Sequence, residues 1–306
     1  MNTGVSPEII KLGLFSGSAS TVLEKQGYTL GRVIGEGSYC KVRIAETRQH
    51  GQVQRYAVKI ISRKKASKDF VSRFLPREIE IVRDLQHPNI IQVHRILDTG
   101  DTVFIFMDIA ERGDLLDYIR THGALNEPKA RNFFRQLVSA IKYLHTKEIT
   151  HRDLKCENVL LCTEDHIKLT DFGFARKCVD QETGKRILSS TYCGSAAYAA
   201  PEILSGTPYN PKMYDVWSLG CILFIMLTGS MPFDDSNIRK MLKYQQERRY
   251  TYPSKVVDIL SPESKALIRH ILEPDITRRA TVDQILKNPW LNQPDPDAGS
   301  SGASTA

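Results

Sequence analysis

The chain has 306 residues, of which 41% are hydrophobic and 25% charged, with a formal net charge of +7. This composition is ordinary for a globular protein and excludes a chain that is disordered throughout, a collagen and a coiled coil. The positive charge permits an acidic partner but does not require nucleic acid, so we expect no nucleic-acid partner.

The cysteines and the apolar segments indicate the cellular setting. Six cysteines are too sparse for a disulfide scaffold, and none forms a C-x-x-C pair. We therefore expect reduced thiols and a cytoplasmic location, with the nucleus as an additional compartment. No signal peptide or myristoylation pattern opens the sequence, and the most apolar run, residues 216–227, is too short for a bilayer. We expect a buried core helix there and no membrane partner.

The two ends of the chain differ in composition from the middle. Residues 1–27 are rich in Ser and Gly without sustained periodicity, and residues 292–306 have almost no bulky apolar side chains. The sequence predicts disordered tails over both ranges, with one folded domain over residues 28–291.

The first part of that domain reads as strands. Apolar alternation predicts an antiparallel meander over residues 28 to about 61, and a further strand over 102–109. Between them, a helix is expected over residues 74–85, where Pro76 is tolerable only in the first turn.

Beyond Gly113 the pattern changes to long helices. Residues 126–145 form the clearest one, with Asn126 as its cap, and residues 216–227 another. The sequence therefore predicts an α+β fold with two lobes: a small antiparallel β lobe with one key helix (about 28–110) and a larger, mainly α-helical lobe (about 111–291). The hinge is expected near residues 107–113.

A glycine-rich segment, Gly35-Glu36-Gly37-Ser38-Tyr39-Cys40-Lys41-Val42, separates the first two strands. Glycines let backbone amides approach phosphate oxygens, although a plain hairpin turn would look the same. Two strands further on, Lys59 occupies a strand fit for burial, and a half-buried ammonium needs an anion. Glu78 lies 19 residues later on the helix and is the candidate partner.

The most informative string is His151-Arg152-Asp153-Leu154-Lys155-Cys156-Glu157-Asn158, followed by Asp171-Phe172-Gly173. A carboxylate such as Asp153 can orient a hydroxyl and accept its proton, while Asn158 and Asp171 carry the hard oxygen ligands that Mg²⁺ prefers. The order and spacing of these residues match a phosphoryl-transfer set.

On these motifs the chain resembles a eukaryotic protein kinase over residues 28–291, which implies the bilobal kinase fold, ATP and Mg²⁺ as cofactors, and protein substrates. The resemblance implies that Asp153 is the catalytic base, that Lys155 and the pair Lys59 and Glu78 support phosphate transfer, and that Asn158 and Asp171 hold magnesium. The residues that it implies for ATP binding are Ile34, Gly35, Glu36, Gly37, Ser38, Tyr39, Cys40, Lys41, Val42, Ala57, Lys59, Met107, Asp108 and Ala110.

Further strings refine the resemblance. Lys155 is typical of serine/threonine kinases, Ala200-Pro201-Glu202 closes an activation segment, Asp215 begins the buried helix, and Arg279 is expected to pair with Glu202. The strings at 75–81, 193–202 and 230–237 resemble the testis-specific serine/threonine kinases of the calmodulin-dependent kinase group, which implies a role in sperm development. The chain is expected to act as a monomer. No calmodulin-binding helix follows residue 291, so calcium regulation is not expected.

Two departures from the kinase pattern leave this expectation in place. Cys40 replaces the third glycine of the loop, yet the two glycines nearest the loop tip remain, so we expect ATP binding to be retained. Ala196 stands where related kinases often have proline, which affects the stiffness of the substrate-docking turn.

The resemblance also locates regulation and substrate choice. Phosphate on Thr191, added by an activating kinase or by trans-autophosphorylation, would pair with Arg152 and Arg176. The ordered segment would then align Asp153 and the substrate-binding residue Ser195. Asp114 and Glu157 would grip an arginine three residues before the acceptor. The segment Arg186-Ile187-Leu188-Ser189 has that spacing, which makes Ser189 a candidate autophosphorylation site.

Two other readings remain. A pseudokinase scaffold would keep the fold without turnover, but it would not need the complete set of Lys59, Glu78, Asp153, Lys155, Asn158 and Asp171. A small-molecule kinase is disfavoured by the 32-residue segment from Asp171 to Glu202, which is long enough to dock a polypeptide.

Overall fold

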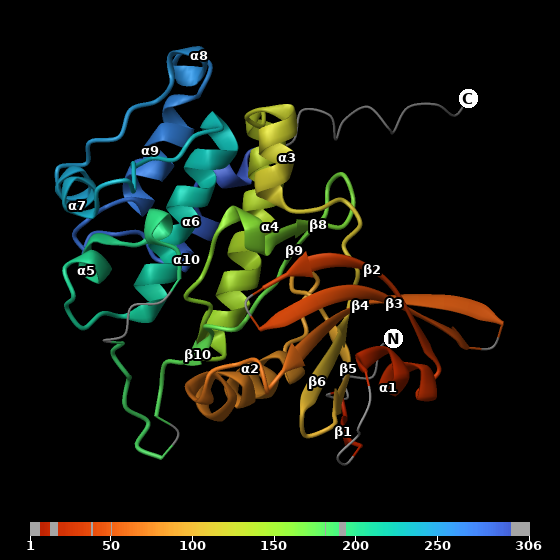
Figure 1. Ribbon diagram of the computed structural model, residues 1–306. Helices are drawn as coiled ribbons and strands as arrows, with labels where there is room; N and C mark the ends of the chain where they lie inside the picture. The colour runs from red at the N-terminus through yellow and green to blue at the C-terminus, as the bar shows by residue number, and fades with distance from the viewer. Residues whose placement is uncertain are drawn as a thin grey trace, which may run out of the picture. The chain divides into compact units, whose positions relative to one another are not determined.

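The computed structural model describes residues 7–12, 18–37, 39–49, 51–180, 182–189 and 194–294. The chain divides into two compact units, Met1–Glu111 and Arg112–Ala306, and the division lies inside the predicted hinge. The first unit is rich in antiparallel strands and the second is mainly helical, as Figure 1 shows. The predicted fold class is therefore confirmed.

Unit 1 is built on a sheet whose described strands run in the order β1-β5-β6-β4-β3-β2. Strands β2, β3 and β4 form the expected antiparallel meander, and β6 pairs antiparallel with both β4 and β5. The strand bounds are β1 Ile9–Lys11, β2 Tyr28–Glu36, β3 Cys40–Gln49, β4 Gln52–Ser62, β5 Val93–Asp98 and β6 Thr102–Met107.

The two faces of this sheet have different neighbours because side chains alternate along each strand. Val58 and Phe106 belong to one face, where they pack in a buried cluster with Val22 and Leu23 of helix α1 (Ala19–Lys25). Lys59, next to Val58 in the chain, therefore projects from the opposite face. Figure 1 shows α1 in red beside the sheet.

The prediction of disorder over residues 1–27 is wrong for the parts that the structure describes. Strand β1 pairs in parallel with β5, and Ser18 caps α1, because its side chain accepts a hydrogen bond from the Thr21 amide. Val22 and Leu23 are 4% and 0% exposed. A seven-residue helix is too short to display a period in the sequence, and the sheet face that stabilises it comes from residues far along the chain.

The expected helix carrying Glu78 is α2 (Leu75–Arg83), with Pro76 in its first turn as predicted. A π-helical turn, η1 (Phe70–Phe74), precedes it, and the Leu75 amide donates to the Phe70 carbonyl. Pro76 has no amide hydrogen to donate, so the regular pattern of helix hydrogen bonds is interrupted at this residue. The π-helical turn lies directly before that interruption.

Unit 2 is organised around helix α6 (Pro211–Thr228), which includes the apolar run at 216–227 and is almost entirely buried. Helix α4 (Glu127–Thr146) packs against it, with Asn126 as the predicted cap. The other helices are α3 Leu115–His122, α5 Pro201–Leu204, α7 Ile238–Gln246, α8 Ser254–Val257, α9 Pro262–Ile271 and α10 Val282–Leu286, with 3-10 turns η2 Cys156–Asn158, η3 Ala196–Tyr198 and η4 Trp290–Asn292.

Short strands and the chain end complete unit 2. Strand β7 (Ile149–Thr150) pairs with β10 (Arg176–Lys177), and β8 (Val159–Leu161) pairs with β9 (Ile167–Leu169). Gln293 accepts a 2.6 Å hydrogen bond from Arg131 of α4, so ordered structure reaches past residue 291. Residues 295–306 of the predicted C-terminal tail lie outside the described residues. None of the helices in the described ranges is long and apolar enough to cross a membrane.

Candidate active site

The glycine-rich segment forms a tight turn in unit 1. Gly35 pairs with Val42 and Glu36 with Lys41 across β2 and β3, and the Gly37 amide donates to the Cys40 carbonyl over 2.9 Å. Glu36 and Lys41 also form an exposed ion pair of 3.0 Å. Ser38 lies outside the described residues. A Cβ on Gly37 would come within 3.1 Å of the Cys40 sulfur, so the thiol packs against the turn and leaves little room there.

The sheet register gathers several of the predicted ATP-binding residues on one face. Val42 lies opposite Lys59, Ala57 lies opposite Met107, and Ala57 and Lys59 are two residues apart on β4. Side chains that are directly opposite or two apart share a face of a sheet. These four residues therefore lie on the face opposite the α1 cluster.

The remaining residues predicted to bind ATP occupy the edges of this region. Ile34 is 37% exposed on β2, and Tyr39 and Ala110 are half-buried. The Tyr39 ring packs against Phe70, with ring centroids 5.3 Å apart. The Asp108 carboxylate instead serves the fold of unit 1, because it accepts hydrogen bonds from the Gln92 amide and lies 2.7 Å from His94 Nε2.

Lys59 and Glu78 form the predicted ion pair. Lys59 Nζ lies 2.6 Å from Glu78 Oε1, and the two side chains are 16% and 4% exposed. Glu78 projects from the first turn of α2 toward the sheet face that carries Lys59. A pair this buried fixes the position of the ammonium group, because separation would leave an unpaired charge inside the protein.

The segment around Asp153 in unit 2 is held by a single buried carboxylate. Asp215 accepts hydrogen bonds from the amides of His151 and Arg152, over 3.0 and 2.9 Å, and also contacts His145 Nε2 at 2.9 Å. The sequence predicted that Asp215 begins the buried helix, but helix α6 begins about one turn earlier, at Pro211. Arg152 adopts a left-handed conformation with φ of 65°. These amide contacts stabilise a backbone turn that a non-glycine residue rarely adopts.

The two oxygens of Asp153 have different surroundings. Oδ2 accepts from Lys155 Nζ at 2.9 Å and from Asn158 Nδ2 at 3.2 Å. Oδ1 is buried and has no hydrogen-bond partner within the described part of the chain. A buried acceptor without a partner is costly and rare, and it marks a position where another donor is expected to bind.

Asn158 and Asp171 present oxygen donors nearby in the same unit. The Asn158 amide nitrogen donates to both the carbonyl and the carboxylate of Asp153, so its amide oxygen points away from Asp153. The backbone of Asn158 binds the amide of Thr170, which precedes Asp171. Asp171 has a φ of 61°, while Phe172 is buried against the His151 ring.

This donor set fits magnesium. Mg²⁺ is usually held by one or two carboxylate or amide oxygens together with substrate phosphates, rather than by a full protein cage. Asn158 and Asp171 offer one amide and one carboxylate oxygen of this kind. The described residues contain no cluster of three or more His, Cys, Asp or Glu side chains arranged to hold a metal.

Comparison with known proteins decides the family. Residues 28–291 match the family described as protein kinase domain. The chain belongs to the protein kinase family. It is 52% identical over 285 residues to testis-specific serine/threonine-protein kinase 1 of Mus musculus, an alignment that covers 93% of this chain and 77% of that protein.

Other relatives support the same group. The chain is 44% identical over 270 residues to testis-specific serine/threonine-protein kinase 3 of Homo sapiens, covering 88% of this chain and 97% of the relative. It is 38% identical over 265 residues to the SNF1-related protein kinase catalytic subunit alpha KIN12 of Arabidopsis thaliana, covering 87% and 51%. The predicted resemblance to testis-specific serine/threonine kinases is confirmed, and the chain is a serine/threonine protein kinase.

The activation segment of the kinase runs from Asp171 to Glu202. Its predicted regulatory residues differ in their exposure and contacts. Thr191 lies outside the described residues. Arg176 is half-buried on β10. Ser189 is only 1% exposed, and its Oγ accepts a 3.0 Å hydrogen bond from Arg152 Nη1. In this arrangement the Ser189 hydroxyl is buried in a contact within the chain, and its role as an autophosphorylation site stays a prediction.

Sequence reasoning missed the role of Gly194. Its φ is +92°, and a Cβ there would lie 2.8 Å from the Arg152 carbonyl and 3.1 Å from Asp153 Oδ1. The missing side chain thus keeps the space beside the unpartnered oxygen open. The glycine was visible in the sequence, but nothing local indicated what it approaches. Ser195, the next residue, is half-buried and precedes the turn η3.

The two carboxylates predicted to select substrates lie near the same thiol. Burial, together with the negative charges of Glu157 and Asp114, raises the pKa of Cys156 to about 12. Glu157 is exposed and accepts from the Tyr198 hydroxyl over 3.4 Å. Asp114 is also the cap of α3, since its Oδ1 accepts from the Asp117 amide over 2.9 Å. The cap gives Asp114 a structural role that the sequence analysis did not anticipate.

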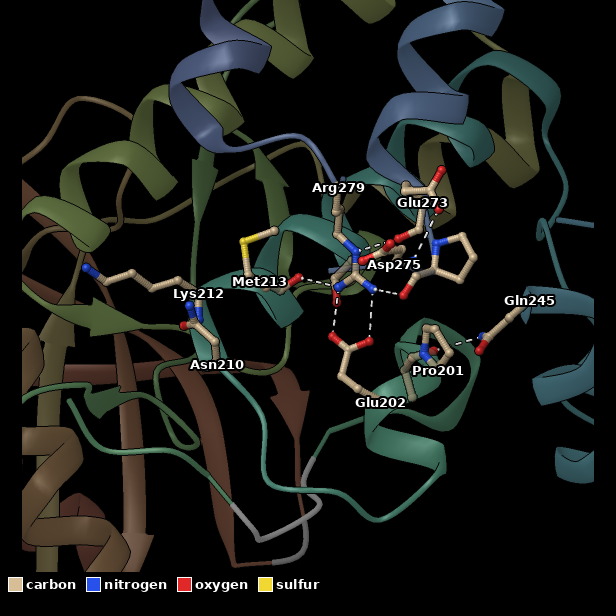
Figure 2. Close-up of polar contacts among 12 residues, drawn as sticks. Pro201, Glu202, Asn210, Lys212, Met213, Gln245, Glu273, Asp275 and Arg279 are labelled. Atoms are coloured by element: carbon tan, nitrogen blue, oxygen red, sulfur yellow. Dashed lines mark hydrogen bonds and ion pairs between the residues drawn. The ribbon is translucent and has the colours of Figure 1, made fainter. Parts of the chain in front are cut away.

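The end of the activation segment is fixed by the predicted Glu202–Arg279 pair, shown in Figure 2. Arg279 donates from Nη1 and Nη2 to the two oxygens of Glu202 over 2.7 and 2.9 Å. It also donates to the carbonyls of Met213 and Glu273 over 3.0 and 2.8 Å. This bidentate pair joins α5 to α6 and to the segment after α9.

Proposed function

We propose that this protein is a catalytically active kinase that transfers the γ-phosphate of ATP to Ser or Thr hydroxyls of protein substrates. The observation that carries this proposal is Asp153, whose Oδ2 is held by Lys155 and Asn158 while Oδ1 is left without a partner among the described residues. A substrate hydroxyl can donate to Oδ1, and Asp153 then orients it and accepts its proton.

The chain's own residues account for nucleotide binding. Lys59, fixed by Glu78, would contact the phosphates, and the glycine-rich turn between β2 and β3 would cover them. Asn158 and Asp171 would hold the magnesium ion. When bound, Mg-ATP supplies the phosphoryl group and the positive charge that stabilises its transfer. A scaffold without turnover would not need this complete set.

The substitution Asp153→Asn tests the activity. We expect phosphate transfer to an arrayed peptide library to fall by roughly 10²–10⁴-fold, because the amide cannot accept the hydroxyl proton. Stabilisation of the protein by Mg-ATP in a thermal shift assay should be retained. The matched control is Asp165→Asn, at an exposed carboxylate in the same unit. If wild type and Asp153→Asn are equally inert although both bind nucleotide, the pseudokinase alternative is correct.

We further propose that the kinase prefers an arginine three residues before the acceptor. Support comes from the positions of Asp114 and Glu157: Asp114 caps α3, and α3 packs against the turn η2 that carries Glu157. A charge-assisted contact of this kind is worth about 1.5–3 kcal/mol, or about one to two decades in selectivity.

The test compares peptides with Arg and with Ala at that position. Wild type should favour the Arg peptide in kcat/KM, and Asp114→Asn with Glu157→Gln should remove the difference. Asparagine is chosen because it still caps α3, so the charge is removed without losing the cap. Equal use of both peptides by wild type would show that these are ordinary surface charges.

We also propose that phosphate on Thr191, added by another kinase or by a second copy of this chain, increases activity. Arg176 and Arg152 are the guanidinium groups on the neighbouring parts of the activation segment and the Asp153 loop. Arg152 already donates hydrogen bonds to Ser189 and to the Phe174 carbonyl, both in the activation segment. The phosphate would add a further contact between that segment and Arg152. A Thr191→Ala protein with undiminished activity after treatment with an activating kinase would contradict this role.

The biological setting is the last part of the proposal. The printed names of the relatives support a role in sperm development. The described cysteines, Cys40, Cys156, Cys162, Cys178 and Cys221, form no disulfide, which supports a reducing compartment such as the cytoplasm or the nucleus. We propose that the protein acts there as a monomer. Fractionation of germ cells, with the size of the native protein measured by light scattering, tests both statements.

A further inference from the structure

Ser189 lies within the activation segment but behaves as a core residue. It is 1% exposed, and its backbone exchanges two hydrogen bonds of 3.0 Å with Tyr209, ahead of α6. The Tyr209 ring packs edge-on against Tyr214 of α6. The hydroxyl, pointing inward, accepts the 3.0 Å hydrogen bond from Arg152 Nη1. One residue thus links the segment both to α6 and to the loop that carries Asp153.

Arg152 needs that acceptor because it is a buried cation. It is 3% exposed, its Nε donates to the Phe174 carbonyl over 2.9 Å, and its Nη1 donates to Ser189. Both of these acceptors belong to the activation segment, and both are uncharged. A guanidinium taken out of water is costly unless its N–H groups are satisfied.

Arg152 is also directly coupled to the catalytic carboxylate. It precedes Asp153, its backbone is left-handed, and its carbonyl is the atom nearest to the position of a Cβ on Gly194. A shift of the Arg152 side chain would therefore move the Arg152 backbone. That backbone positions Asp153 and also borders the space between Gly194 and Asp153 Oδ1.

We propose that Ser189 is a positioning residue for phosphate transfer, whose hydroxyl docks the activation segment on Arg152 without any phosphate. The inference rests on the proposed role of Asp153 as the base. Ser189 supplies the neutral acceptor that keeps Arg152, and through it Asp153, in place. The unphosphorylated kinase therefore has a basal activity that depends on Ser189 and not on Thr191.

Two substitutions test the hydroxyl. Ser189→Ala removes it, and Ser189→Cys keeps nearly the same volume but offers only a weak sulfur acceptor. We expect both to lower kcat roughly 10- to 100-fold, the value of a hydrogen bond to a charged group, with little change in the KM for ATP. Ser189→Thr keeps the hydroxyl and should restore most of the rate. The control is Thr183→Ala, because Thr183 is exposed in the same segment and its hydroxyl bonds to near neighbours in the chain, the Asp180 carboxylate and the Lys185 amide.

The kinetic comparison is made in a Thr191→Ala background, so that no phosphate on that residue contributes. Ser189→Ala is also combined with Arg152→Ala. If Ser189 acts through Arg152, it should have no further effect once Arg152 is removed. Equal losses in both backgrounds would show a merely structural role, and wild-type kcat in the Ala and Cys variants would overturn the proposal.

An activity-independent measurement separates this proposal from the catalytic one. Hydrogen exchange at the Ser189 and Tyr209 amides should accelerate in Ser189→Ala and stay at the wild-type rate in Ser189→Thr and Thr183→Ala. If wild type proves inert while this exchange pattern holds, the docking contact stands and the proposed activity is wrong. Unchanged exchange in Ser189→Ala would refute the docking contact itself.

Discussion

The Glu202–Arg279 pair allows a quantitative prediction for unit 2. The two side chains are 7% and 0% exposed, and the guanidinium lies 4.9 Å from the ring centroid of Trp217. Glu202→Gln keeps the size of the side chain and removes its charge. The Arg279 guanidinium would then keep the Met213 and Glu273 carbonyls as hydrogen-bond acceptors. It would lose the negative charge of Glu202, which is its one ion-pair partner among the described residues.

Removing one partner of a buried ion pair typically costs about 3–5 kcal/mol, because the remaining charge stays buried without compensation. For a unit of this size that corresponds to a fall in Tm of about 2–4 °C per kcal/mol, or roughly 6–20 °C. Arg279→Met removes the other partner. The double substitution should cost less than the sum of the two single ones, since it leaves no unpaired charge at this position.

Intrinsic fluorescence provides the assay. The chain has two tryptophans, Trp217 and Trp290, and both belong to unit 2, so their emission reports the unfolding of that unit alone. The control is Glu182→Gln, at an exposed carboxylate of the activation segment. If Glu202→Gln lowers the Tm no more than this control, or if the two single losses simply add in the double variant, the ion pair does not stabilise unit 2 as argued.

Two further predictions concern Asp153 and the stability of unit 2. Gly194→Ala should lower kcat roughly a hundredfold in a kinase assay, because the new Cβ would clash with the Arg152 carbonyl and with Asp153 Oδ1. Gly206→Ala is the control in the same assay. Gly206 also has a positive φ, of +69°, but no atom lies within 4 Å of the position of its Cβ. Burial would raise the pKa of Glu127, but hydrogen bonds from Trp290, Ser261 and Ser264 outweigh it and hold that pKa below its usual value. The carboxylate therefore stabilises the fold above its unfolded pKa of about 4.3, and this contribution is lost as pH falls below that value. Glu127→Gln should lower the Tm at pH 7, and the difference from wild type should shrink on acidification in a fluorescence melt; a constant difference down to pH 3.5 would contradict the assignment.

The parts of this kinase that depend on near neighbours in the chain could be predicted from the amino-acid sequence. Alternation along the chain predicted the meander of β2, β3 and β4, and the Asn126 cap with the following apolar stripe predicted α4. The motif around Asp153 and the Lys59–Glu78 pair were likewise accessible, because their residue types and spacing match a known set. Such features are encoded within a turn of helix, a strand pair or a family motif.

Other features were decided only by the tertiary structure. Ser189 looked like an exposed phosphorylation site, yet it meets Arg152 from 37 positions away and is buried by the contact. The segment before Tyr28 looked disordered, yet it packs on a sheet face assembled from β3 to β6. Gly194 carries no mark of the carbonyl that it approaches, and Asp114 caps a helix while lying near Glu157. Burial and pairing between distant residues depend on how elements pack together, and no local pattern in the sequence contains that information.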